Sequence, residues 1–172
     1  MNPDAPVSGV TAADAAALAD LVARYALYAD ERDIPRLTGL FTPDGVLVLP
    51  DPPRALGPVL TRTGHEEIAA AMTALESLTM TFHALAGQVF DPGPEPGTAT
   101  GAVACVAHHL SVRDSVSDSV HDGGPTDLVW HLRYADGYRR HDGAWRIARR
   151  EVRIDWIETR PVRRVRGREG ER

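Results

Sequence analysis

The chain has 172 residues, 43% of them hydrophobic, which is the size of one domain with a single core. Its formal net charge of -5 argues against a general nucleic-acid or anionic-membrane surface, because such partners favour a basic face. Every basic residue other than histidine is arginine, which excludes Schiff-base chemistry and a P-loop lysine. The single cysteine, Cys105, excludes an intramolecular disulfide.

Residue types divide the chain into three parts. We expect a flexible N-terminus over residues 1–10, an α+β domain over residues 11–160 and an Arg-rich, disordered tail over residues 161–172, which has too few apolar residues to order itself. The N-terminus lacks the features of a signal peptide, and no segment is long enough to span a bilayer. We therefore expect a cytoplasmic protein without a membrane or nucleic-acid partner.

The first predicted element is an amphipathic helix that begins after Thr11 and runs to about Arg32. Thr11 and Asp14 have capping-box spacing. The helix ends in acidic residues, which are unfavourable at the negative end of a helix dipole. Asp33 is explained as the N-cap of a short helix over "IPRLTGLF". Asp30 has no such role, and its position beside the apolar stripe lets it point inward.

Strands dominate the rest of the chain. "GVLVLP" predicts a strand, the Pro-rich residues 50–60 an irregular loop, and "GHEEIAAAMTALES" a helix. The "HDG" turn predicts a hairpin, and residues 114–125 a mobile loop. This order predicts an α+β cone with an internal pocket. The long strands are expected over residues 80–90, 98–112, 127–139 and 144–157.

Four segments carry a family resemblance: "RYALYADERDIPRLTGLFTPDGVL", "TFHALAGQVF", "TATGAVACVAHHL" and "LRYADGYRRHDGAWRIARREVRIDW". They resemble the SnoaL-like branch of the nuclear transport factor 2-like superfamily, which includes scytalone dehydratase, ketosteroid isomerase, limonene epoxide hydrolase and polyketide cyclases. The resemblance implies a cone-shaped α+β barrel with a curved, mainly antiparallel sheet wrapped around N-terminal helices. It also implies a homodimer or homotrimer.

The pattern is most similar to scytalone dehydratase, in which an Asp late in the first helix and two strand histidines line the cavity. Carried over by position, the resemblance implies Asp30, His83 and His109 as catalytic residues. A shorter loop would select His108 instead, and only one of these neighbours can enter the pocket because adjacent strand residues face opposite sides. The sequence departs from the pattern at Ala29, where scytalone dehydratase has a tyrosine that helps to hold a water on its substrate's carbonyl.

These residues suit acid–base chemistry without a cofactor. A neutral imidazole can take a proton from carbon beside a carbonyl, and a buried carboxylate can orient it. The second histidine could protonate a departing oxygen or polarise the carbonyl. We expect dehydration, isomerisation or cyclisation of a small hydrophobic cyclic or polyketide-like substrate in a mostly apolar pocket. The candidate substrate-binding residues are Tyr25, Tyr28, Val46, Phe82, His108, His131 and Trp156.

Each assignment has a structural alternative. Asp30 could satisfy its charge with Arg133 or Arg149, and His83 could be a core histidine bonded to backbone. Asp30, His83 and His109 could also form a metal site, but no tight ligand spacing occurs and we expect no metal. The whole protein could instead be a non-catalytic ligand-binding module or an accessory subunit, such as the small subunit of an aromatic-ring dioxygenase.

Overall fold

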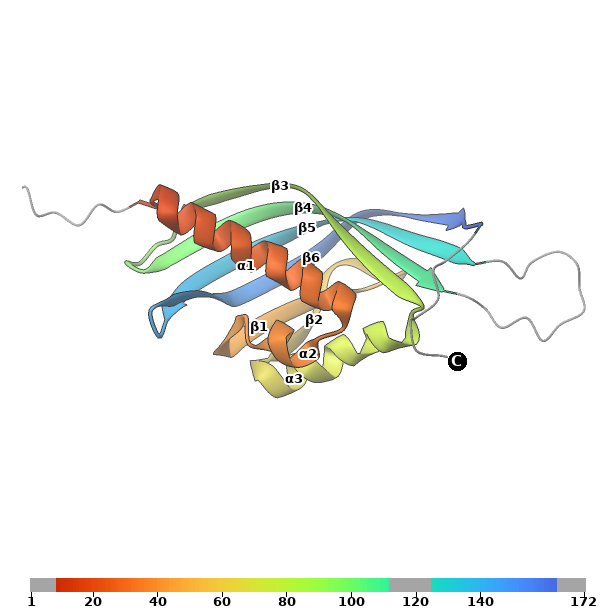
Figure 1. Ribbon diagram of the computed structural model, residues 1–172, viewed down its shortest axis with the longest axis horizontal. Coiled ribbons are helices and arrows are strands. Elements are labelled where there is room, and N and C mark those ends of the chain that lie inside the picture. The colour runs from red at the N-terminus through yellow and green to blue at the C-terminus, as the bar shows by residue number, and fades with distance from the viewer. Residues whose placement is uncertain (1–8, 112–124, 164–172) are drawn as a thin grey trace, which may run out of the picture.

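A computed structural model describes residues 9–111 and 125–163 of the chain. In this part, six strands form one curved sheet, and α1 lies lengthwise across one of its faces (Figure 1). The fold is therefore the predicted α+β cone. The predicted mobile loop over residues 114–125 lies almost wholly outside the described residues, as do most of the two predicted terminal segments. No helix within the described ranges is long and apolar enough to cross a membrane.

The helices follow the signals at their ends. Helix α1 (Ala12–Glu31) has Thr11 as its N-cap, with the complete capping box to Asp14 that the sequence predicts. Helix α2 (Ile34–Thr38) begins at the N-cap Asp33, whose carboxylate accepts a hydrogen bond from the Arg36 backbone at 3.0 Å. The third predicted helix is divided into α3 (Gly64–Met72) and a 3-10 turn, η1 (Thr73–Ser77).

The sheet has the order β2-β1-β6-β5-β4-β3. Strands β1 and β6 run parallel, and the other neighbours are antiparallel. The predicted hairpin between the last two strands is confirmed, with Asp142 and Gly143 at the positive φ angles that a tight two-residue turn requires. The strands are β1 (Phe41–Asp51), β2 (Ala55–Thr63), β3 (Met80–Pro92), β4 (Thr98–Ser111), β5 (Thr126–His141) and β6 (Ala144–Pro161).

The prediction of an irregular loop over residues 50–60 is wrong, because β2 occupies its second half. Pro58 favoured the prediction of a loop, because proline removes a backbone hydrogen-bond donor from a strand. Strand β2 is an edge strand, paired only with β1 among the described strands, so it tolerates this loss.

The core contains a fully buried ion pair. Arg150 on β6 donates two hydrogen bonds to Asp136 on β5, at 2.8 and 2.6 Å, and both side chains are 0% exposed. The guanidinium also lies 4.1 Å from the ring centre of Tyr25 and 4.2 Å from that of Tyr134. This stack joins α1 to β5 and β6.

Candidate active site

A cavity of about 250 Å³ lies between the sheet, α1 and the segment formed by α3 and η1. Its walls are mainly apolar, and its few polar groups include the imidazoles of His83 and His109 and the side chains of Tyr25 and Tyr134. Such a mostly apolar pocket with a few convergent polar groups is typical of a small-molecule site. Apolar side chains lining it include Leu49, Met72, Leu75, Leu78, Leu128, Leu132 and Val152.

Asp30 and His83 form a hydrogen-bonded pair beside this cavity. The Asp30 carboxylate accepts a hydrogen bond from the His83 ring Nδ1 at 2.6 Å and another from the His83 backbone N–H at 2.9 Å. Burial raises the carboxyl pKa and is the largest single influence, but the two hydrogen bonds from His83 outweigh it and lower the pKa of Asp30 overall. The ionised carboxylate therefore holds a proton on Nδ1 of His83, and Nε2 is the ring nitrogen left for proton transfer.

The alternative pairing of Asp30 with an arginine is absent among the described residues. Arg133 instead pairs with Asp155 at 2.9 Å, and Arg149 pairs with Glu151 at 2.7 Å. Asp30 is thus bonded to a histidine that lines the cavity, which is the arrangement required of an acid–base pair.

His109 on β4 is the second histidine at the cavity. Its ring lies edge-on to that of His83, with 6.1 Å between the ring centroids, and packs against Trp130 at 4.4 Å. The Nδ1 atom bonds to the backbone carbonyl of Leu128 on β5 at 3.0 Å. Burial lowers the pKa of His109 to about 4.

Several residues expected to bind substrate lie elsewhere. Tyr25 lines the cavity, whereas the Tyr28 hydroxyl accepts a hydrogen bond from Arg24 at 3.3 Å and its ring packs against Arg36. Tyr28 is therefore a buried core residue one turn beyond Tyr25 that does not line the cavity. Val46 is also absent from the cavity lining, so the assignments of Tyr28 and Val46 to the pocket are corrected.

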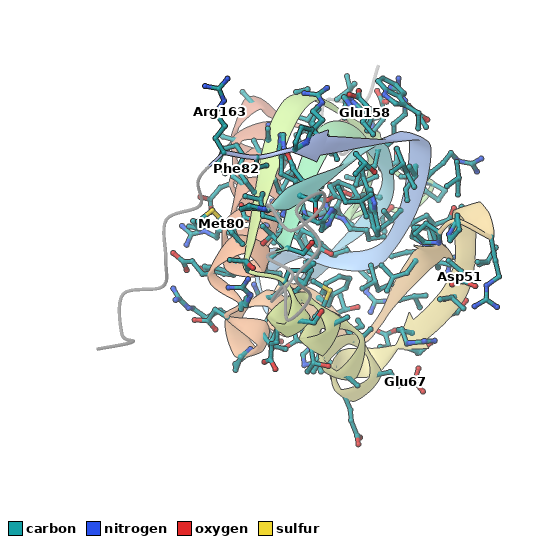
Figure 2. The ribbon with its side chains drawn as sticks, turned by 90° about the vertical axis from the view of Figure 1, so that its right-hand side faces the viewer. Asp51, Glu67, Met80, Phe82, Glu158 and Arg163 are labelled. Atoms are coloured by element: carbon teal, nitrogen blue, oxygen red, sulfur yellow. The ribbon has the colours of Figure 1, made fainter. Side chains whose placement is uncertain are left out.

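Four further candidates lie on the outer face of the sheet. Phe82 is 58% exposed and Trp156 is 51% exposed, and Figure 2 shows Phe82 at the periphery of the molecule. His108 bonds to Asp127 at 2.6 Å, and His131 stacks on Trp156 with 4.0 Å between ring centroids. Phe82 and His108 are neighbours of the cavity histidines, so strand alternation turns them to the opposite face. All four are corrected to outer-face residues.

Trp156 is turned outward by a β-bulge. On the β5–β6 ladder, Leu132 pairs with Ile154 on the inner face, but His131 pairs with Trp156 on the outer face. Asp155 is the extra residue between these pairs, so strict alternation from Ile154 places Trp156 on the wrong side.

Trp130 and Tyr134 line the cavity but were not singled out in the sequence. Both alternate along β5 with Leu132, which also lines the cavity, so residues two apart on this strand share its inner face. The wall formed by α3 and η1 had no comparable signal. In the described ranges, no group of three or more His, Cys, Asp or Glu side chains is arranged to hold a metal ion.

The fold is that of the nuclear transport factor 2-like superfamily, and the Asp30–His83 pair lies beside its mainly apolar cavity. The sequence model of the SnoaL-like domain family matches residues 10–151, and the chain belongs to this family. A comparison with curated protein sequences finds no match.

Three solved structures illustrate the structural similarity. A candidate scytalone dehydratase from Novosphingobium aromaticivorans has a TM-score of 0.67 and 18% identity, covering 93% of this chain and 96% of that one. A type 2 hexachlorocyclohexane dehydrochlorinase (LinA) has a TM-score of 0.70 and 14% identity, with coverages of 91% and 95%. A candidate aromatic ring hydroxylase from N. aromaticivorans has a TM-score of 0.69 and 22% identity, with coverages of 87% and 95%. At these identities the similarities show the fold.

Proposed function

We propose that this protein is a cofactor-independent acid–base enzyme, a dehydratase, isomerase or cyclase, acting on a small hydrophobic cyclic or polyketide-like molecule. The observation that carries the proposal is the Asp30–His83 pair, joined at 2.6 Å, whose imidazole opens into an apolar cavity. In such an enclosure, a carboxylate that orients an imidazole also stabilises the imidazolium formed during proton transfer.

The chemistry begins with His83 as the base. Its Nε2 takes a proton from carbon beside a carbonyl, the C–H electron pair forms an enolate, and Asp30 stabilises the imidazolium. Tyr25 and Tyr134 are hydroxyl donors for the enolate oxygen, because burial raises their pKa values and keeps them protonated. Return of the proton to a leaving hydroxyl gives dehydration, and its return to another carbon gives isomerisation. Attack of the enolate carbon on a second carbonyl gives cyclisation.

The similar structures support this reaction class by their names. The scytalone dehydratase and the dehydrochlorinase are both named for eliminations, in which a proton and a leaving group depart from neighbouring carbons. Family membership agrees with such an activity, although the same fold serves many functions. The specific reaction proposed here therefore rests on Asp30 and His83.

The test is turnover by site variants. A panel of fused-ring hydroxyketones, with 3-hydroxy-1-tetralone as the first member, is followed by the absorbance of the naphthol that dehydration would form. Asp30→Asn and His83→Asn should each lower kcat/KM by about 10²- to 10⁴-fold, the usual contribution of general acid–base catalysis. Asp33→Asn is the matched control, because Asn preserves the N-cap of α2 away from the cavity. Unchanged turnover in both site variants would refute the proposal.

A second candidate is an accessory or ligand-binding subunit. The similarity to a candidate aromatic ring hydroxylase favours it, as do the exposed apolar side chains Phe82, Val89 and Trp156. In the leading proposal, the same outer face joins copies of the chain in a cytoplasmic homodimer or homotrimer. Purification from the native host separates the two: a homo-oligomer supports the enzyme, and a stable complex with a larger oxygenase chain supports the accessory subunit.

A further inference from the structure

We propose that His109 is a neutral hydrogen-bond acceptor that selects substrates carrying a free hydroxyl group. The inference rests on the proposed function of the same cavity and deepens it. It states that the second histidine accepts a hydrogen bond, and it names the class of substrate that can donate one. In this assignment His109 is a positioning residue, and it does not protonate a leaving oxygen.

The backbone fixes the tautomer of His109. Its Nδ1 lies 3.0 Å from the carbonyl oxygen of Leu128, the residue directly opposite it on the β4–β5 ladder. A carbonyl oxygen can only accept, so Nδ1 must carry the proton. In the neutral ring, Nε2 is then a lone-pair acceptor. It has no hydrogen-bond partner among the described residues.

The surroundings of His109 oppose a second proton. The ring is 7% exposed and lies against the rings of Trp130 and His83, neither of which is an anion. Burial disfavours the imidazolium most strongly. The hydrogen bond to Leu128 and the carboxylates of Asp127 and Asp30 favour it and His83 opposes it, and the pKa of His109 falls to about 4. Nε2 is therefore an acceptor at neutral pH, and His109 cannot serve as a general acid there.

The acceptor at His109 discriminates between substrates that can donate a hydrogen bond and substrates that cannot. The cavity thus holds the Nε2 lone pair of His109 beside the ring of His83 and next to apolar walls. A hydroxylated ring can donate to His109 while its acidic C–H meets His83. An ether, epoxide or halide has no proton to donate and leaves the His109 acceptor unpaired, which a buried polar site disfavours. The geometry points to alcohols, phenols or enols as substrates.

Equilibrium binding tests the preference without turnover. 1-Naphthol and 1-methoxynaphthalene share one ring system and differ in whether the oxygen can donate. By isothermal titration, 1-naphthol should bind about tenfold more tightly to the wild-type protein, the usual worth of one buried hydrogen bond. His109→Phe should reduce this preference to about twofold or less while leaving the affinity for 1-methoxynaphthalene similar. The matched control is His65→Phe, which also removes a histidine bonded to a backbone carbonyl but lies outside the cavity lining.

A second measurement keeps the inference testable if His109→Phe does not fold. NMR of the histidine ring nitrogens in the wild-type protein should show His109 neutral, with its proton on Nδ1, at neutral pH. A proton on Nε2, an imidazolium, failure of 1-naphthol to bind, or a preference that survives in His109→Phe would each overturn the inference. Since neither measurement requires catalysis, a hydroxyl preference without any turnover would refute the proposed reaction while supporting the role of His109.

Discussion

Replacement of Asp136 by Asn tests the buried ion pair beside the cavity. Asn keeps the size of the side chain and one acceptor oxygen, but it leaves the fully buried Arg150 without a countercharge. The burial of Arg150 opposes its charge, and the attraction of Asp136 outweighs this and raises the arginine pKa. One guanidinium nitrogen, Nη1, is already buried without a partner among the described residues, so the site has no spare acceptor to compensate.

The expected cost is large. Removing one partner of a buried ion pair costs about 3–5 kcal/mol, which is a large fraction of the roughly 5–15 kcal/mol that stabilises a domain. Arg150→Met should cost less, since Asp136 keeps the 2.6 Å hydrogen bond from the Tyr138 hydroxyl. The double variant Asp136→Leu with Arg150→Met should be more stable than Asp136→Asn alone, because a pair of apolar residues leaves no unpaired charge.

Urea denaturation of the three variants measures these differences at constant m value. Because Arg150 stacks on Tyr25 and Tyr134, which line the cavity, 1-naphthol binding should weaken in parallel with stability. A loss below about 1 kcal/mol in Asp136→Asn would refute the reasoning. So would a double variant that is no more stable than Asp136→Asn alone, because removing both partners should relieve the unpaired buried charge.

Two further predictions concern stability. The pKa of Asp30 is lowered by folding, so its ionisation stabilises the native state above the ordinary carboxyl value of 3.8, and this contribution is lost as the pH falls through the lower native value. The stability difference between wild type and Asp30→Asn should therefore shrink as the pH falls from 7 to below 3.8, and urea midpoints that keep a constant difference would contradict this. In Gly101→Ala, the new Cβ would lie 2.8 Å from a ring carbon of Tyr138 and should cost about 1–3 kcal/mol by thermal denaturation. Gly57→Ala is the control, since its Cβ meets no atom within 4 Å and should be nearly neutral.

Local signals were sufficient for most of the fold. The Thr11–Asp14 capping box marks the start of α1, and the alternating runs predict β3 to β6 within a few residues. Strand β2 was missed because proline reads as a strand breaker unless the strand is known to lie at an edge. Edge position depends on which strands pair, and that is a property of the whole sheet rather than of the segment.

The candidate site shows a similar division. Position in the family pattern brought Asp30 and His83 together, and the structure joins them by two hydrogen bonds. Because side chains alternate along a strand, His109 and His108 face opposite sides of the sheet. The same rule fails at Trp156, because one extra residue in β6 turns this side chain to the outer face. The tautomer of His109 depends on a carbonyl of a different strand, so no reading of local sequence could have found it.

The acidic end of α1 has a structural explanation that involves the neighbouring Arg32. Asp30 stands where the helix dipole disfavours a carboxylate, and the two hydrogen bonds from His83 offset this cost. Arg32 ends the helix in a left-handed conformation and donates to the backbone carbonyls of Leu75 and Leu78, at 3.0 and 2.6 Å. Both leucines line the cavity. The segment that holds the carboxylate is therefore also tied to the cavity wall, so the geometry of the acid–base pair and the shape of the pocket depend on the same helix end.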